Sequence, residues 1–387
     1  MNRSSNNIIS EIYNRITKVS GNPPTHLHEP KLDKIDKKYL NNCIDSGFIS
    51  SNGKFIDLFE KKISSYTNSK YSIATVNGTS ALHIALRTLN VEKDDEVLLP
   101  SFNFIAAANA ILYCNAIPHF IDIDEKNLFV DEIKLEKYLS KICKVKKNHT
   151  YNKYTNRIIK AAIPMYTFGH AGNVPKVIKV LKKFKIKIIE DAAEALGTFY
   201  KKKHAGTFGD VGIISFNGNK IISTGGGGII LTNNKKIADK AKHISKTSKL
   251  KKKWKFEFDE LGYNYRMPNI NAALGCAQFK KLKFILKKKR KIFKEYKDLF
   301  KDLPNVKILS ENKFSKSNYW LQTLILENFT KKFKENLLDY SNKKKVFLRP
   351  AWCLLHEVKY LKKYPKMNLS NSTKMFNKVI SLPSSQY

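Results

Sequence analysis

Short apolar runs rich in β-branched residues alternate with helical patterns between about residues 71 and 241. Seven such runs, each bounded by polar or turn-forming residues, predict strands at 71–76, 96–99, 119–122, 158–165, 187–190, 212–216 and 228–231. Apolar residues at helical spacing between them predict helices at 80–89, 106–113, 131–139 and 174–184. Strands joined by helices make right-handed crossovers, so we predict an α/β fold with a mainly parallel, seven-stranded sheet covered on both faces.

The pattern changes after residue 246. A turn-rich stretch at 262–269 precedes a long predicted helix at 271–300, and strand-like pieces near 306–309 and 319–326 precede a helical stretch near 331–340. We therefore predict a large domain at 26–249 and a smaller α+β C-terminal domain at 250–387. The first 25 residues look polar and predict a loosely attached N-terminal extension, 1–25.

The chain is strongly basic, with 71 Lys and Arg against 33 Asp and Glu and a formal net charge of +38. Such a charge raises nucleic acid as a partner, and a basic nucleic-acid-binding protein is the alternative from a different functional class. The excess is Lys in short runs scattered along the chain, at 201–203, 251–253, 287–291 and 343–345. A nucleic-acid site needs basic residues gathered on one face and interleaved with aromatics, so we expect solvated surface and no specific nucleic acid.

Cysteine usage and hydropathy bear on the compartment. The five cysteines are far apart and form no CxxC pair, which is typical of a reducing environment. The N-terminus lacks an unbroken apolar segment, and the most apolar stretch, 105–117, is interrupted by Asn109 and Asn115. We expect a cytoplasmic protein with no membrane span.

The first stretch that could carry chemistry is Asn77-Gly78-Thr79-Ser80, between a predicted strand and a predicted helix. Small residues at a helix N-terminus let backbone N–H groups approach an anion such as phosphate. An ordinary helix cap explains the same residues. No GxxxxGK[ST] or GxGxxG pattern accompanies them, which argues against a nucleoside triphosphate or a dinucleotide.

The second stretch is the end of the predicted strand at 187–190, where Asp191 and Glu194 follow among alanines. Open α/β sheets bind ligands at the carboxyl ends of their strands, so a carboxylate here has room to reach a cofactor. The competing interpretation is an Asp that caps a helix.

The third stretch runs from Asp210 to Gly228 and delivers Ser215 and then Lys220 into a turn followed by four glycines. Apolar Ile221 and Ile222 follow the lysine, so we expect its amine to be desolvated. A desolvated amine gives up its proton more easily and can act as nucleophile and base.

A phosphate cradle, a carboxylate and a lysine, in that order, form the set that pyridoxal 5′-phosphate requires. The chain resembles the DegT-type sugar aminotransferases, which are fold type I pyridoxal-phosphate enzymes acting on nucleotide-linked keto sugars. It is especially similar to the bacillosamine and legionaminic-acid type transaminases in EDAAEALGTFYKKKHAGTFGDVGIISFNGNKIISTGGGGII at 190–230. The resemblance extends through LHEP at 27–30, SGFISSNGKFIDLFE at 46–60, VNGTSALHIAL at 76–86, PSFNFIAAANAI at 100–111, GYNYRMPNINAALG at 262–275 and RPAWCLLH at 349–356.

The resemblance implies roles for individual residues. Lys220 corresponds to the lysine that carries the cofactor as a Schiff base, and Asp191 to the partner of the pyridine nitrogen. The other implied cofactor-binding residues are Gly78, Thr79, Ser80 and Ser215 at the phosphate, Phe104 stacked on the ring, and Glu194. Asn264 and Arg266 lie in a loop that reaches the neighbouring subunit's site in relatives, which implies a homodimer with shared active sites. Implied substrate-binding residues are His26, Lys54, Arg349 and His356; for Lys54 and His356 a surface or packing role is an equal alternative.

The implied activity is transfer of an amino group, with glutamate as the donor, to C4 of a UDP-linked 4-keto-6-deoxy-N-acetylhexosamine. The alternatives are 3- or 4-amination of a dTDP- or GDP-linked keto sugar. The family's dehydratase branch has His in place of the Schiff-base lysine, so Lys220 argues against dehydration. Asp122 and Asp124 form a DxD pair at a strand end, but no metal is expected. Relatives continue past Tyr387 with another helix, so we expect a less stable small domain.

Overall fold

The computed structural model describes residues 3–250 and 252–385. Its main sheet has the strand order β1-β11-β10-β7-β6-β2-β3. All of these strands run in one direction except β11, which is antiparallel to both of its neighbours. The strands are β1 (Tyr71–Thr75), β2 (Glu96–Pro100), β3 (Ile117–Ile121), β6 (Ile159–Ala162), β7 (Lys187–Asp191), β10 (Val211–Ser215) and β11 (Gly228–Thr232). The predicted mainly parallel sheet is confirmed, with a strand at each predicted place.

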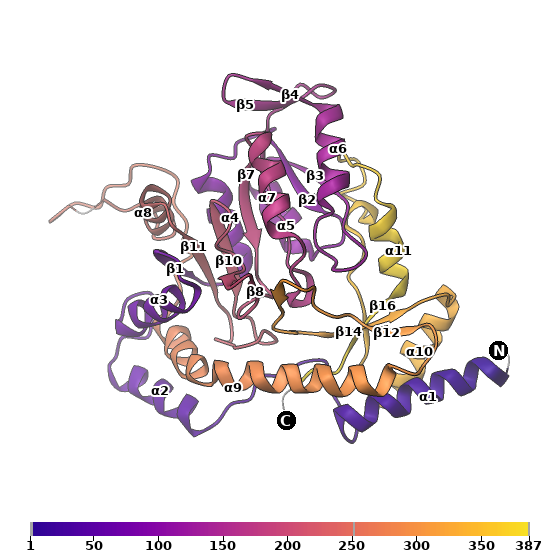
Figure 1. Ribbon diagram of the computed structural model, residues 1–387. Coiled ribbons are helices and arrows are strands. Elements are labelled where there is room, and N and C mark those ends of the chain that lie inside the picture. The colour runs from indigo at the N-terminus through magenta and orange to yellow at the C-terminus, as the bar shows by residue number, and fades with distance from the viewer. Residues whose placement is uncertain (1–2, 251, 386–387) are drawn as a thin grey trace.

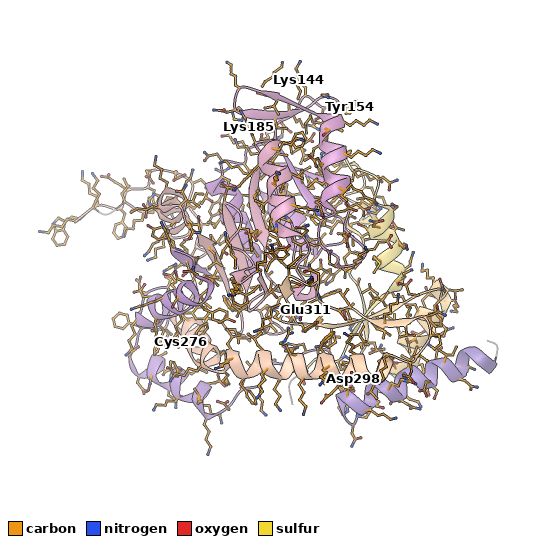
Figure 2. All side chains as sticks on the ribbon, viewed as in Figure 1. Lys144, Tyr154, Lys185, Cys276, Asp298 and Glu311 are labelled. Atoms are coloured by element: carbon orange, nitrogen blue, oxygen red, sulfur yellow. The ribbon has the colours of Figure 1, made fainter. Side chains whose placement is uncertain are left out.

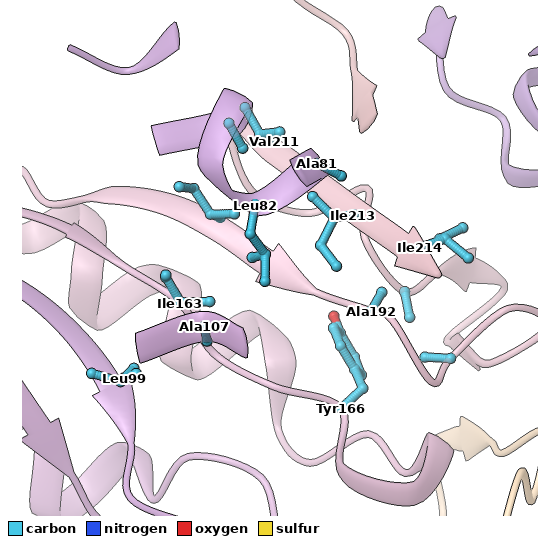
Figure 3. Packing of buried hydrophobic residues seen from close by; sticks show 14 of the residues in the cluster. Ala81, Leu82, Leu99, Ala107, Ile163, Tyr166, Ala192, Val211, Ile213 and Ile214 are labelled. Carbon is cyan, nitrogen blue, oxygen red and sulfur yellow. The ribbon is translucent and has the colours of Figure 1, made fainter. Parts of the chain in front are cut away.

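Helices cover both faces of this sheet, and every residue of β2, β10 and β11 is therefore buried. Figure 3 shows Ala81 and Leu82 beside Val211 and Ile213 of β10, and all four side chains are at most 2% exposed. The helices of this part of the chain are α2 (Lys34–Asp45), α3 (Lys54–Thr67), α4 (Gly78–Thr88), α5 (Ile105–Tyr113), α6 (Glu132–Ile142), α7 (Val174–Lys183) and α8 (Lys235–Ile244).

A smaller antiparallel sheet of order β12-β14-β16-β15 lies beside the first. Its strands are β12 (Val306–Ile308), β14 (Gln322–Leu326), β15 (Arg349–Pro350) and β16 (Val379–Leu382), and its helices are α10 (Lys331–Lys343) and α11 (Ser370–Lys378). The long helix α9 (Asn269–Phe300) runs past both sheets (Figure 1). Its first half packs into the hydrophobic core of the large sheet and its last turns into a second core. The domain boundaries remain a prediction.

The N-terminal helix α1 (Arg3–Ser20) belongs to this second core. Ile12 and Ile16 are fully buried, and Arg15 forms an ion pair of 2.6 Å with Asp302 just beyond α9. The expectation of a loosely attached extension is therefore wrong for α1. Isoleucines at helical spacing form one apolar stripe, which the polar residues around them conceal in the sequence.

Two hairpin-like additions complete the fold. Strands β4 (Cys143–Lys146) and β5 (His149–Asn152) project beyond the amino-terminal ends of the parallel strands. Figure 2 shows Lys144, Tyr154 and Lys185 at this end, away from α9. Strand β13 (Ser315–Lys316) pairs with β8 (Phe199–Tyr200), which also pairs with β9 (Lys203–His204), so these three short strands form a separate sheet between the two parts of the chain. Among the helices of residues 3–250 and 252–385, none is long and apolar enough to cross a membrane.

Candidate active site

Two strand ends and the start of α4 meet at the carboxyl edge of the large sheet. Asp191 is the last residue of β7 and Ser215 the last residue of the adjacent parallel strand β10. Helix α4 begins at Gly78 directly against Ser215: a Cβ on Gly78 would lie 3.1 Å from the Ser215 Cβ. A side chain at position 78 would require Ser215 to move by a few tenths of an ångström, so glycine suits this close approach.

A cavity of about 300 Å³ lies at this meeting point. It is lined by many of the residues that the sequence singles out, namely Gly78, Thr79, Phe104, Asp191, Glu194, Ser215 and Lys220. The structure therefore brings together residues that lie up to 142 positions apart in the chain. Their individual roles remain proposals.

The start of α4 has both a helix cap and free N–H groups that could bind a phosphate, the two interpretations of its sequence. Asn77 is the cap, because its side chain accepts a hydrogen bond of 2.8 Å from the Ser80 N–H. The first N–H groups of a helix have no acceptor within the helix. The Ser80 N–H is taken up by the cap, and Ser80 lies outside the cavity lining, so the N–H groups of Gly78 and Thr79 are the ones available to an anion in the cavity.

Two carboxylates lie in the cavity wall with little compensation for their burial. Asp191 is 5% exposed and accepts a 3.2 Å hydrogen bond from the Ala193 N–H. Burial raises its pKa to about 6, against the opposing effects of that hydrogen bond and of Lys220. Glu194 accepts from the Phe168 N–H at 2.8 Å, and burial raises its pKa to about 7 although Lys220 acts in the opposite direction.

Lys220 lies in the loop after β10, and its amine faces two groups. Its Nζ is 3.2 Å from a carboxylate oxygen of Glu194 and 4.0 Å from the centroid of the Trp320 ring. Ile221 and Ile222 are buried beside it, as the sequence predicts. The Lys220 side chain is only 14% exposed, so its amine is largely shielded from water.

Trp320 and Trp352 also line the cavity and are absent from the sequence-based site. Both come from the C-terminal part of the chain, 100 and 132 residues after Lys220. Trp352 packs against Phe104 and Phe168, with ring centroids 5.9 and 5.1 Å apart. The sequence feature that could have pointed to Trp352 is its place in the RPAWCLLH motif.

The contacts of Arg266 all lie within its own chain, and its predicted role at a neighbouring subunit's site stays a prediction. Arg266 is 4% exposed, and its guanidinium forms an ion pair of 2.5 Å with Glu60 and donates to the Ala74 carbonyl at 3.1 Å. An isolated antiparallel β-bridge pairs Arg266 with Thr75, the last residue of β1. Asn264, two residues earlier, is exposed and lies outside the cavity lining.

The four predicted substrate residues lie outside the cavity lining as well. His26, Lys54 and Arg349 are exposed, and Arg349 donates to the Asn342 side chain at 3.1 Å. His356 is closer to the sheet edge, where its Nδ1 is 2.6 Å from the Ser101 hydroxyl. Their roles in substrate binding remain predictions.

The DxD pair is used inside the fold. The buried Asp122 carboxylate binds the Lys134 amine at 2.8 Å and accepts from the backbone and hydroxyl of Ser372. Within the part of the chain that the structure describes, no cluster of three or more His, Cys, Asp or Glu side chains could hold a metal ion.

Comparison with known proteins agrees with this fold. The sequence pattern of the DegT/DnrJ/EryC1/StrS aminotransferase family matches residues 30–387. GDP-perosamine synthase of Vibrio cholerae is 33% identical over 361 residues, 92% of this chain and 93% of that protein. UDP-4-amino-4,6-dideoxy-N-acetyl-beta-L-altrosamine transaminase of Campylobacter jejuni (subsp. jejuni serotype O:23/36) is 31% identical over 369 residues, 94% and 92% of the two chains. The structure of Helicobacter pylori PseC, an aminotransferase involved in pseudoaminic acid biosynthesis, superimposes with a TM-score of 0.83 at 26% identity over 93% of each chain.

Proposed function

Given that the chain belongs to the DegT/DnrJ/EryC1/StrS family and is a pyridoxal-phosphate-dependent nucleotide-sugar aminotransferase of fold type I, we propose that it aminates C4 of a nucleotide-linked 4-keto-6-deoxyhexose. The first candidate substrate is the UDP-linked N-acetylated sugar, and the proposed donor is glutamate. The observation that carries the proposal is the shared cavity of Lys220, Asp191 and the α4 N-terminus.

The residues of the cavity fit pyridoxal phosphate. The N–H groups of Gly78 and Thr79 and the hydroxyls of Thr79 and Ser215 form a cradle for a phosphate. Asp191 is a buried carboxylate whose raised pKa reports the lack of a full cationic partner, which a protonated pyridine nitrogen would supply. Lys220 offers the amine that attaches an aldehyde.

Bound pyridoxal phosphate supplies an aldehyde that takes up and later releases the amino group, and a ring that accepts the negative charge left by proton removal. Asp191 holds the proton on the pyridine nitrogen through its charge. Lys220, once free, moves a proton to and from the reacting carbon, and the Glu194 carboxylate at 3.2 Å holds the amine in place. The Lys220 side chain is only 14% exposed, which limits the access of water to the amine.

The choice among nucleotide sugars rests on resemblance. The motif at 190–230, with Glu at position 194, supports the UDP-linked N-acetylated sugar. A GDP-linked 4-keto-6-deoxyhexose is the second candidate, because the Vibrio cholerae relative at 33% identity is a GDP-perosamine synthase.

The test is incubation of the purified holoenzyme with glutamate and a panel of UDP-, dTDP- and GDP-linked 4-keto-6-deoxy sugars, with products read by mass spectrometry and NMR. We expect the mass change of a ketone converted to an amine, at C4, and fastest with the UDP-linked sugar. Fastest turnover of the GDP-linked sugar would replace the first candidate by the second. Turnover of none of them would contradict the proposed function.

We also propose a homodimer with shared active sites, in which exposed Asn264 contributes to the neighbouring site. The test mixes Lys220→Ala with Asn264→Ala protomers under subunit exchange. Both lesions can then fall in one site and leave the other intact, so activity above that of either variant alone is expected. No recovery despite proven exchange would place Asn264 in its own subunit's site, or outside any site.

A further inference from the structure

Trp320 is the aromatic side chain closest to the reactive end of Lys220 among the contacts of the described residues. The Lys220 Nζ lies over the Trp320 ring, 4.0 Å from its centroid, with the Glu194 carboxylate at 3.2 Å. A lysine amine over an indole face is attracted by the negative face of the ring, most strongly where water is excluded. The free amine therefore has one defined position between a carboxylate and an indole.

Trp320 is also tied to the loop that carries the lysine. Its indole N–H donates a 2.7 Å hydrogen bond to the carbonyl of Asn219, the residue before Lys220. The indole thus contacts the amine through its face and the lysine's own backbone turn through its edge. A single side chain can in this way set both the start and the end of the Lys220 side chain.

The segment around Trp320 is itself held at several points. The Trp320 N–H donates to the Asn318 side chain at 2.9 Å, and the Asn318 amide donates to the carbonyls of Glu194 and Leu196 at 2.8 and 3.0 Å. The same segment therefore fixes the Glu194 loop and the Lys220 loop relative to each other.

A buried lysine supports the segment from the side of α9. Lys289 is fully buried, and its amine donates to the Trp320 carbonyl at 2.7 Å and to the Ser384 carbonyl. Desolvation lowers the Lys289 pKa well below its ordinary value. These bonds join α9, the Trp320 segment and the C-terminal tail behind the cavity.

We propose that Trp320 is a positioning residue that holds the free amine of Lys220 in its working place and orientation. This inference rests on the proposed function, in which Lys220 alternates between an attached and a free amine. The indole and Glu194 receive the amine when it is free, so that it returns to the reacting carbon along the same path. Displacement of a reacting group by about 1 Å can cost about 100-fold in rate.

The test uses Trp320→Leu, which removes both contacts, and Trp320→Phe, which retains a ring but loses the bond to the Asn219 carbonyl. Phe284→Leu is the matched control, because Phe284 is 59% exposed on α9. The readout is independent of turnover: each cofactor-free protein is mixed with pyridoxal phosphate, quenched with borohydride at set times, and the label on Lys220 is quantified by peptide mass spectrometry from pH 6 to 9.

We expect Trp320→Leu to slow attachment at Lys220 by about 10- to 100-fold, Trp320→Phe to slow it by less, and Phe284→Leu to leave it unchanged. The rate constant of the glutamate half-reaction should fall in the same order, with a smaller change in the apparent affinity for glutamate. Wild-type attachment rates in both folded Trp320 variants, judged by circular dichroism, would overturn the inference. Failure of the wild-type enzyme to aminate any sugar of the panel would instead contradict the proposed function, while the attachment rates still decide the role of Trp320.

Discussion

The buried carboxylates at the carboxyl end of β7 differ from the buried carboxylate at the start of β2 in how far hydrogen bonds compensate their burial. At the carboxyl end, Asp191 and Glu194 have pKa values raised to about 6 and about 7 by burial. At the amino-terminal end, Glu96 is fully buried at the start of β2, yet its pKa is lowered. The fold therefore stabilises the ionised form of Glu96 and disfavours the ionised forms of Asp191 and Glu194.

The partners of Glu96 explain the difference. Burial acts to raise its pKa, but His119, Asn152 and Thr155 hydrogen-bond its carboxylate and outweigh that effect. His119 continues the network to the Tyr138 hydroxyl at 2.7 Å. This network fastens the β5 end of the projecting hairpin and α6 to the sheet, which is a structural use of a buried charge.

Asp191 lacks such a network and receives one backbone hydrogen bond. A site that must bind a cationic ring cannot satisfy its own carboxylate beforehand, so the folded protein carries the cost until the ligand arrives. The number of partners therefore distinguishes the Asp191 carboxylate, which is left to meet a ligand, from the Glu96 carboxylate, which has a structural role.

The largest expected effect is on the reaction rate, which should depend on Asp191 and not on Glu96. Asp191→Asn keeps the shape of the side chain and removes its charge, so the glutamate half-reaction of the holoenzyme should slow by about 100- to 1,000-fold. Stopped-flow spectroscopy measures it. Glu96→Gln is the matched control and should retain the wild-type rate per folded molecule. An Asp191→Asn rate near wild type would remove Asp191 from its role.

The next effect concerns stability at the opposite edge. Glu96→Gln leaves His119 without its carboxylate in a fully buried place, so the free energy of unfolding should fall by about 2–4 kcal/mol. Chemical denaturation of the cofactor-free protein at pH 8 measures it. An unchanged midpoint would show that the network does not stabilise the fold.

The smallest expected effect is a gain in stability, on replacement of Asp191 in the cofactor-free protein. Because the Asp191 pKa is higher in the folded protein than in the unfolded chain, this group favours folding below about pH 4 and loses that contribution as the pH rises through about 6. Asp191→Asn removes the loss, so the cofactor-free variant should be more stable than wild type at pH 8 by about 1–3 kcal/mol, and by less at pH 5. Thermal or denaturant unfolding at the two pH values checks this. Equal or lower stability of the variant at pH 8 would contradict the cost assigned to Asp191.

The sheet and much of the site follow from local features of the sequence. Strands such as β10 and β11 are continuous apolar runs, which a strand buried on both faces requires. Asp191 and Ser215 end two of these runs, and parallel strands end at the same edge, so their proximity is predictable.

What the sequence does not reveal depends on distant partners. Arg266 is turned inward by Glu60, 206 residues away, and no local pattern announces that pair. Trp320 joins the cavity because the C-terminal part of the chain folds back over it, 101 residues from the carbonyl of Asn219 that it contacts. Helix α1 was concealed because its buried stripe is narrow and its other residues are polar.

The measurement that tests the central claim most directly is identification of the lysine that attaches the cofactor. The holoenzyme is reduced with borohydride, digested and mapped by mass spectrometry, with Lys220→Ala treated in parallel. The account predicts a single reduced pyridoxyl label on Lys220 in the wild-type protein and no stoichiometric label in the variant. A label on any other lysine of this lysine-rich chain, with Lys220 unmodified, would contradict it.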